Sequence, residues 1–266
     1  MTQTTLVPRR YGGVNWIGFR TLYLREVKRF WKVGMQTVLA PVMTSLLYML
    51  IFVVAVGGTR SGAEGVTFAE FIGPGLIMMS ILNNAFANSS SSILQAKMMG
   101  LTPDFLTPPL SPIELAAGFA AGAMTRGVFV GLVTAISVWF FTRFHLQHIW
   151  AVAYFGFGAA LMLGLAGIFA GLWSEKFDHL AAVSNFIVMP MTFLSGTFYL
   201  VDRLPEPFRT VSHYNPFFYM IDGFRYGFIG FADGSLTVGV ILVGVINVVL
   251  AIACWALFHT GYRLKS

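Results

Sequence analysis

The apolar stretch from Phe71 to Ile93 carries a stripe of polar side chains. Its members follow steps of four, four, three and four, which places them on one face of a helix: Ser80, Asn84, Asn88, Ser91 and Gln95. Lipid cannot satisfy hydroxyls and amides, so this polar stripe must face protein or water. Two interpretations stay open: hydrogen bonds between packed helices, or one wall of a polar-lined path.

A single arginine, Arg126, stands among apolar neighbours in the next apolar stretch. A charge inside a membrane span is a functional candidate, but this arginine is also close enough to one end of its span to snorkel to the surface. Glycines flank it in two small-x-x-x-small pairs, Gly118 with Gly122 and Gly127 with Gly131. Such pairs are weak indications of a helix contact.

Catalytic, metal and nucleotide chemistry find little support in the sequence. No nucleophile has a convincing acid or base partner, so we expect no catalytic residues. His145 and His148 are three residues apart but lack a third ligand, and we favour polar residues at a membrane interface over metal. No phosphate-binding Gly-x-x-x-x-Gly-Lys-Ser/Thr loop is present, so ATP and Mg²⁺, if used, must bind a different chain.

Composition indicates an all-α polytopic membrane protein. The chain is 56% hydrophobic and only 11% charged, against about 25% charged in soluble domains. The formal charge of +6 does not indicate a nucleic-acid partner, because basic stripes and base-stacking surfaces are missing. Six stretches reach the roughly 20 residues needed to span a membrane. They are Val38–Gly57, Phe71–Ile93, Leu115–Phe141, Ile149–Trp173, Leu180–Leu200 and Leu236–Phe258.

An amphipathic helix is predicted from Asn15 to Lys32, before the first span. Aromatic and apolar residues recur at steps of three and four: Trp16, Phe19, Tyr23, Val27 and Phe30. Basic residues occupy much of the remainder, with Glu26 as the only acid. Such a helix should lie in the plane of an anionic inner leaflet and contact its lipids.

Charge also orients the chain. Seven basic residues precede the first span, namely Arg9, Arg10, Arg20, Arg25, Lys28, Arg29 and Lys32, and the tail adds Arg263 and Lys265. With six spans, both termini are then cytoplasmic. The outward loops hold Arg60, Arg143, Arg203, Arg209 and Arg225.

Two connecting segments are unusual. The cytoplasmic loop 94–114 holds four of the eleven prolines, which interrupt helix on both sides of a short segment that starts at Pro103. The outer segment 201–235 carries an aromatic run that is too short to span and includes Asp222 and Arg225. A re-entrant or interfacial helix pair fits this outer segment best, and it is compatible with an aromatic belt.

Several local strings, taken together, resemble the permease subunit of type-2 ABC exporters. They are Arg25–Phe30, Gln36–Pro41, Phe71–Leu76, Thr107–Pro112 and Leu194–Tyr199, followed by Leu204-Pro205 and Asn215-Pro216. The resemblance covers nearly the whole chain, so residues 1–266 form a single transmembrane domain. Residues 1–35 would be the cytoplasmic tail and interface helix.

The resemblance implies a homodimer, or a pair of permeases, bound to two separate ATP-binding subunits in the bacterial inner membrane. The loop after the second span would dock into the ATP-binding subunit as a coupling helix. By position, that contact would comprise Asp104, Phe105, Leu106, Thr107 and Pro108, with Glu26 near enough to pair with the coupling region. Candidate residues of the transport path are Asn84, Asn88, Ser91, Phe193 and Ser195.

The family moves polysaccharides, lipo-oligosaccharides, lipids and amphipathic drugs. Walls rich in phenylalanine and poor in charge favour an amphipathic, lipid-linked or glycoconjugate-type molecule over a free ion. An ATP-independent channel or secondary transporter, using the polar stripe and Arg126, is the alternative.

Overall fold

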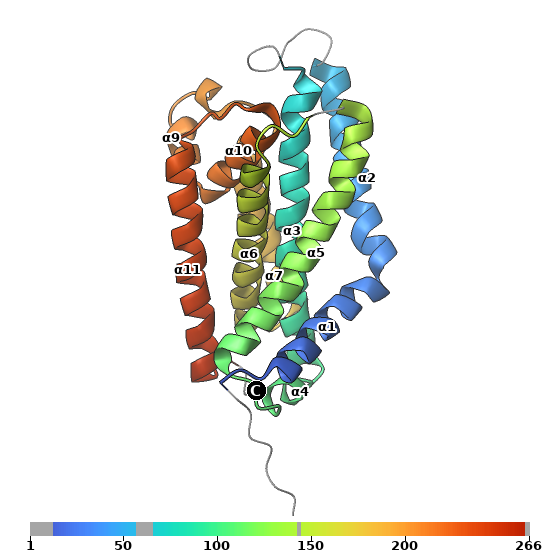
Figure 1. The fold of residues 1–266 in the computed structure, drawn as a ribbon, viewed down its shortest axis with the longest axis vertical. Helices are drawn as coiled ribbons and strands as arrows, with labels where there is room; N and C mark the ends of the chain where they lie inside the picture. Colours follow the sequence, from blue (N-terminus) through green and yellow to red (C-terminus); the bar gives the residue numbers. More distant parts are fainter. Residues whose placement is uncertain (1–12, 57–65, 143–144, 264–266) are drawn as a thin grey trace, which may run out of the picture.

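The structure, a computed structural model, describes residues 13–56, 66–142 and 145–263. Over these ranges the chain folds into helices joined by turns and loops and contains no β-strand, as the composition predicts. The helices form one elongated bundle (Figure 1). The predictions for the first twelve residues and for Gly57, Arg60, Arg143 and Lys265 fall outside the described residues.

Helix α3, Phe68–Met98, is the centre of the bundle. Its start is fixed by a capping box: the Thr67 backbone N–H donates to the Glu70 carboxylate at 2.9 Å, and the Glu70 backbone N–H donates to Thr67 Oγ1 at 3.3 Å. It packs along α5, Pro112–Thr142, and α6, Ile149–Trp173. Most of α3 is buried over its whole length, so this helix connects both ends of the molecule.

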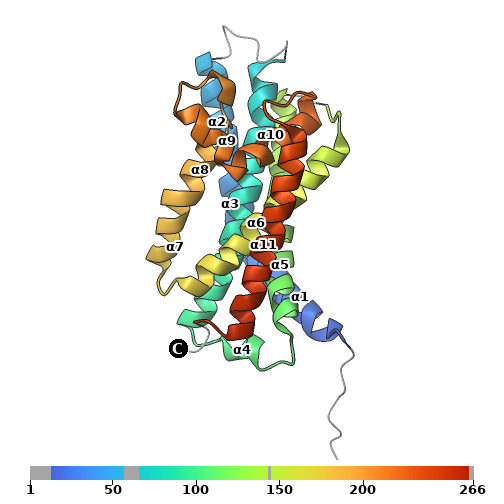
Figure 2. The ribbon, with the colours of Figure 1, turned by 90° about the vertical axis from the view of Figure 1, so that its left-hand side faces the viewer.

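Length and apolar composition support four of the six predicted spans among the described residues. These four are α2, Gly34–Val56, together with α5, α6 and α11, Leu236–Thr260. Helix α3 is long enough to be the second span, at 31 residues, but it carries the polar stripe. The four apolar helices and α3 run roughly parallel along the long axis of the bundle (Figures 1 and 2).

The predicted fifth span is not one continuous helix. Helix α7, Phe177–Val183, passes into a π-helical segment, Ser184–Val188, and then into α8, Met189–Phe193. The helical run ends at Phe193 instead of Leu200, and the chain then turns at Gly196, where φ is +72°. Glycine adopts this left-handed conformation without a steric penalty, so the turn stops the helix early.

The amphipathic helix is present as α1, Trp16–Lys32, and Val33 alone separates it from α2. Because α2 begins at Gly34, four residues earlier than predicted, Pro41 lies two turns inside the helix. Figure 1 shows α1 meeting α2 at a corner at the lower end of the bundle.

The buried face of α1 differs from the predicted aromatic face. Leu22, Glu26 and Phe30 are buried at steps of four, whereas Trp16 is 70% exposed. The reason lies about a hundred residues along the chain, where Gly118 of α5 leaves room for the Leu22 side chain. Small residues let helices approach closely, so the position of the glycines decides which face of α1 packs.

The two ends of the bundle are built differently. At the upper end, η3, Val201–Arg203, and α9, Phe208–Tyr214, lead into α10, Pro216–Ile229. With 14 residues, α10 is about 21 Å long, and it packs against α6, α3 and α11. At the lower end, the one-turn helix α4, Pro103–Leu106, connects α3 to α5 (Figure 2).

Candidate functional site

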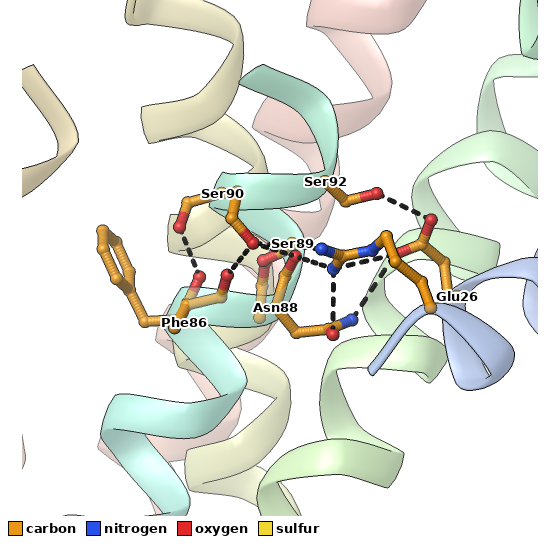
Figure 3. A network of polar contacts seen from close by, with 10 residues as sticks. Glu26, Phe86, Asn88, Ser89, Ser90 and Ser92 are labelled. Carbon is orange, nitrogen blue, oxygen red and sulfur yellow. Dashed lines mark hydrogen bonds and ion pairs between the residues drawn. The ribbon is translucent and has the colours of Figure 1, made fainter. Parts of the chain in front are cut away.

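The carboxylate of Glu26 is the centre of a buried polar network between α1 and α3 (Figure 3). Ser92 Oγ donates a hydrogen bond to Glu26 Oε1 at 2.7 Å, and Asn88 Nδ2 donates to Oε2 at 3.5 Å. The guanidinium of Arg29 lies 3.4 Å from the same Oε2. A buried charge is tolerated when it is paired and hydrogen-bonded, and these three donors meet that condition.

Arg29 extends this Glu26 network along α3. Its Nη2 donates to the backbone carbonyl of Asn88 at 2.6 Å and to Asn88 Oδ1 at 3.0 Å, and its Nη1 donates to Ser91 Oγ at 3.2 Å. Burial lowers the pKa of the guanidinium from its ordinary value, and the neighbouring Glu26 partly opposes that shift. The network therefore links α1 to the middle of the polar stripe.

A glycine of α5 makes room for the network. A Cβ atom at Gly122 would lie 2.5 Å from Glu26 Cβ, closer than real Cβ contacts come. Gly122 therefore lets the stem of Glu26 pass between α5 and α3. The pair Gly118 and Gly122, a weak signal in the sequence, is the surface of α5 on which α1 lies.

Two further members of the polar stripe, Ser80 and Asn84, are also paired within the chain. Ser80 Oγ lies 3.2 Å from Ser45 Oγ of α2. Asn84 Oδ1 accepts a hydrogen bond from Arg126 Nη2 at 3.3 Å. The stripe thus meets α2 at Ser80 and α5 at Asn84, one turn apart. In this conformation these two side chains make hydrogen bonds between packed helices, the first of the two interpretations given above.

The residues of the predicted coupling helix point in two directions. Phe105 is buried, with its ring 5.4 Å from that of Phe119 in an edge-to-face arrangement. Asp104, Leu106 and Thr107 are exposed. Phe105 therefore attaches α4 to the bundle, while its three neighbours are free to meet another molecule.

Glu26 does not lie against α4, although the resemblance suggested that it could pair with the coupling region. Its hydrogen-bond partners are Asn88 and Ser92 of α3 and Arg29 of α1. The contact between α1 and α4 is made by Arg25, whose guanidinium lies 5.8 Å from the centre of the Phe105 ring. The two helices are thus joined by a cation–π contact and not by a salt bridge.

The last two predicted path residues lie together at the other end, in the turn after α8. Ser195 is buried; its hydroxyl donates to the Met191 carbonyl and accepts from Asn215 Nδ2 at 2.8 Å. Phe193 is half-buried in an aromatic cluster with Tyr48 of α2 and Phe198, at ring distances of 6.3 and 5.5 Å. Phe193 ends α8 and Ser195 follows it, whereas Glu26 belongs to α1, which lies toward the other end of the bundle from α8 (Figure 2).

Sequence reasoning missed three members of these clusters. Arg29 was counted only as a basic residue, although its three-residue spacing from Glu26 is a signal for an ion pair. Ser92 was not included in the stripe. Asn215 was seen only as part of an Asn-Pro string, and its bond to Ser195 explains why the two late strings occur together.

Comparison with known proteins places the chain in a class. Residues 18–229 match the family model of the ABC-2 type transporter, and the chain belongs to this family. The chain is 39% identical to the inner membrane transport permease YadH of Escherichia coli K12 over 255 residues, 94% of this chain and 98% of that relative. It is 22% identical to Nodulation protein J of Rhizobium leguminosarum bv. viciae over 246 residues, 88% and 91% of the two chains. The resemblance read from the sequence is confirmed: the chain is a transport permease with several membrane-spanning helices.

Proposed function

We propose that this chain is the transmembrane subunit of an ATP-driven exporter in the bacterial inner membrane. A separate ATP-binding subunit carries ATP and Mg²⁺, and a second copy of the permease completes the path. The family and the permease relative support the class. The exposed face of α4 is the single observation that carries the proposal.

Helix α4 has the properties of a transmitting element. Asp104 and Leu106 are exposed at the tip, where an acceptor groove on another protein could receive them. Phe105 anchors the same four-residue helix in the hydrophobic core beside Phe119. Because α4 follows directly on α3, a push on its exposed face is delivered to the central helix of the bundle.

The proposed topology has six spans: α2, α3, α5, α6, the broken helix α7–α8, and α11. Both termini and α4 face the cytoplasm, in keeping with the basic residues of α1. In this arrangement α9 and α10 form the outer segment. At about 21 Å, α10 is shorter than the roughly 30 Å of hydrocarbon, which favours a re-entrant position.

The proposed path runs along α2, α3 and α8. Asn84, Asn88 and Ser91 would line its inner part, and Phe193 and Ser195 its outer part. In the described conformation Asn88 is fully buried under the Glu26 network, so opening this path requires that α1 and α3 separate. A second copy would face α2, whose apolar side is exposed at Leu39 and Leu47.

An amphipathic, lipid-linked or glycoconjugate-type cargo suits this path best. Aromatic rings from two elements meet near its outer part, with Phe52 stacked on Phe198 at 4.5 Å and Tyr48 edge-on to Phe198 at 5.8 Å. Aromatic faces offer apolar contact area and attract cations instead of solvating free anions. Asn84 and Asn88 supply the complementary hydrogen-bonding groups.

Reconstitution with the ATP-binding subunit tests the proposal. We expect Asp104→Arg to abolish permease-stimulated ATP hydrolysis without reducing membrane insertion, because the charge reversal meets the partner directly. Phe105→Ala should also reduce stimulation, but with a loss of thermal stability, since its ring is buried. The matched control is Thr210→Ala, an exposed position at the other end of the bundle. Unchanged ATP turnover in both α4 variants would contradict the proposal.

The alternative, a channel or secondary transporter that works alone, has its own discriminating experiment. Proteoliposomes that contain only this chain should show no flux under the proposal. ATP-independent flux that Asn84→Leu abolishes would favour the alternative, because the polar stripe would then serve a path without a motor.

A further inference from the structure

A basic cleft lies between α1 and the lower end of α3. Its volume is about 600 Å³, within the range of about 300–1,000 Å³ typical of small-molecule sites. Four cationic side chains of α1 line it: Arg25, Lys28, Arg29 and Lys32. Their spacing of three, one and three residues puts them on one side of the helix.

Most of this positive charge is uncompensated. Arg29 is used by the Glu26 network, but Arg25, Lys28 and Lys32 form no ion pair with any described residue. Glu26 is the only carboxylate on α1, and its oxygens are already occupied by Arg29 and α3. Like charges three or four residues apart destabilise a helix, so an anion in the basic cleft would relieve a repulsion that α1 otherwise retains.

The opposite wall is amphipathic. Gln95 offers an uncharged polar group, while Met99 and Leu101 offer apolar surface. The lining contains neither a carboxylate nor an aromatic ring. A nucleotide, whose base would need a stacking partner, is therefore less well matched than a molecule with an anionic head and an apolar tail.

The surroundings of the cleft favour a lipid as the source of that molecule. Trp31, adjacent to Lys32, is 63% exposed, and Met35 is 85% exposed. Large exposed apolar side chains beside basic ones are typical of a helix at a membrane surface. Under the proposed topology this surface faces the inner leaflet, where anionic headgroups lie within reach of the cleft.

We propose that the basic cleft binds the phosphate group of an anionic phospholipid of the inner leaflet. Arg25, Lys28 and Lys32 contact the phosphate, and Gln95 supplies a hydrogen bond beside it. The inference rests on the proposed orientation of the chain, but it requires neither ATP nor the ATP-binding subunit. A bound lipid would stand next to the Glu26 network and would favour the conformation in which α1 lies against α3.

The test measures lipid binding to the purified full-length chain in neutral detergent, by native mass spectrometry with phosphatidylglycerol and, separately, phosphatidylcholine. Each basic residue near an anionic lipid contributes about a fivefold factor, so Lys28→Gln should weaken phosphatidylglycerol binding about fivefold. The triple variant Arg25→Gln, Lys28→Gln, Lys32→Gln should weaken it roughly 100-fold. Arg20→Gln removes the same charge from an exposed position of α1 outside the cleft and should change binding less than twofold.

Several outcomes would overturn the inference. Equal effects of Lys28→Gln and Arg20→Gln would mean that overall charge, not the cleft, attracts lipid. Equal binding of the two phospholipids would exclude a phosphate site selective for anionic lipid. Displacement by equimolar inorganic phosphate would indicate a site for a free anion. Variants that keep lipid affinity but no longer bind the ATP-binding subunit would assign the cleft to protein contact. If the triple variant fails to fold, the single variants test whether the cleft binds lipid.

Discussion

Two arginines, the partly buried Arg29 and the buried Arg225, lie near opposite ends of the bundle and are held in different ways. Arg29 of α1 reaches across to α3 and binds a carboxylate, a backbone carbonyl and two side-chain oxygens. Arg225 of α10 lies 4.0 Å above the ring of Phe71, donates to the Gly196 carbonyl and is 4.0 Å from Asp222. The side chain of Arg29 is 25% exposed, and that of Arg225 only 2%.

We call the Glu26 network a joint, because it connects helices that have to separate, and the Arg225 cluster a fastening, because it holds the upper end of the bundle together. The Glu26 network connects two helices that must move apart if the polar stripe is to line a path. At the other end, Asp222 accepts the backbone N–H groups of Asp233 and Gly234, both at 2.9 Å, so the Arg225 cluster ties loops to helices. The upper cluster holds the loop at Asp233 and Gly234, and Phe71 of α3, against α10.

The largest effect should come from the upper cluster. Arg225→Leu should lower the free energy of unfolding by about 3–5 kcal/mol, because it leaves Asp222 buried without its cation. The measurement is chemical unfolding of the purified protein in detergent. Arg209→Leu breaks an exposed ion pair with Asp202 and should cost under about 1 kcal/mol. Equal losses of stability in the two variants would contradict the role of the Arg225 cluster as a fastening, because an exposed ion pair would then contribute as much.

The same kind of change in the lower network should cost less stability. Glu26→Gln should lower the free energy of unfolding by about 2–3 kcal/mol, because it leaves the partly buried charge of Arg29 without a carboxylate. Glu175→Gln is the control, since that carboxylate is 66% exposed and 3.5 Å from Arg263. A Glu26→Gln loss as large as that of Arg225→Leu would show that both ends are fastenings.

The contact of α1 with Gly118 and Gly122 of α5 offers a steric test of the joint. In Gly122→Ala the added methyl group would collide with Glu26, and we expect a loss of about 1–2 kcal/mol. Amide hydrogen exchange should rise in α1 and stay unchanged in α10. Gly34→Ala has open space around its Cβ and should be neutral. Unchanged exchange in α1 of Gly122→Ala would show that α1 is not held by this contact.

The smallest effect is expected in the turn after α8. Ser195→Ala removes the hydroxyl that accepts from Asn215 and should cost about 1 kcal/mol in the free energy of unfolding. Ser137→Ala, whose hydroxyl bonds only to the Val133 carbonyl of its own helix, should be nearly neutral. If both variants behave alike, the turn is held by its backbone and not by Asn215.

The sequence predicted the elements better than the contacts. The polar stripe and the one-turn helix at Pro103 follow from local signals, namely helical spacing and proline positions. The burial of Glu26 does not, because it depends on Gly122, which lies 96 residues away and is one of 28 glycines. Phe105 was predicted to face a partner, and its burial depends equally on a distant ring, that of Phe119.

The break in the fifth span shows a second limit. Leu180–Leu200 is mostly apolar, and composition alone cannot show where a helix unwinds. Pro190, near the change from π-helix to α-helix, is a local signal of a break in the helix, since proline removes a backbone donor. The turn at Gly196 is stabilised by residues that follow it in the chain, including Arg225.

The single residue between α1 and α2 has a mechanical consequence. Val33 offers only two backbone dihedral angles, so the two helices have little freedom to rotate independently. Helix α2 has 23 residues and is about 35 Å long, and a 10° tilt at its base would displace its far end by about 6 Å. Pro41 is the one position in α2 where a missing hydrogen bond would let the rod bend and absorb that displacement. The stiffness of α2 at Pro41 thus decides how much of a movement of α1 reaches the far end of α2. Distance measurements between α1 and the far end of α2 would give that displacement.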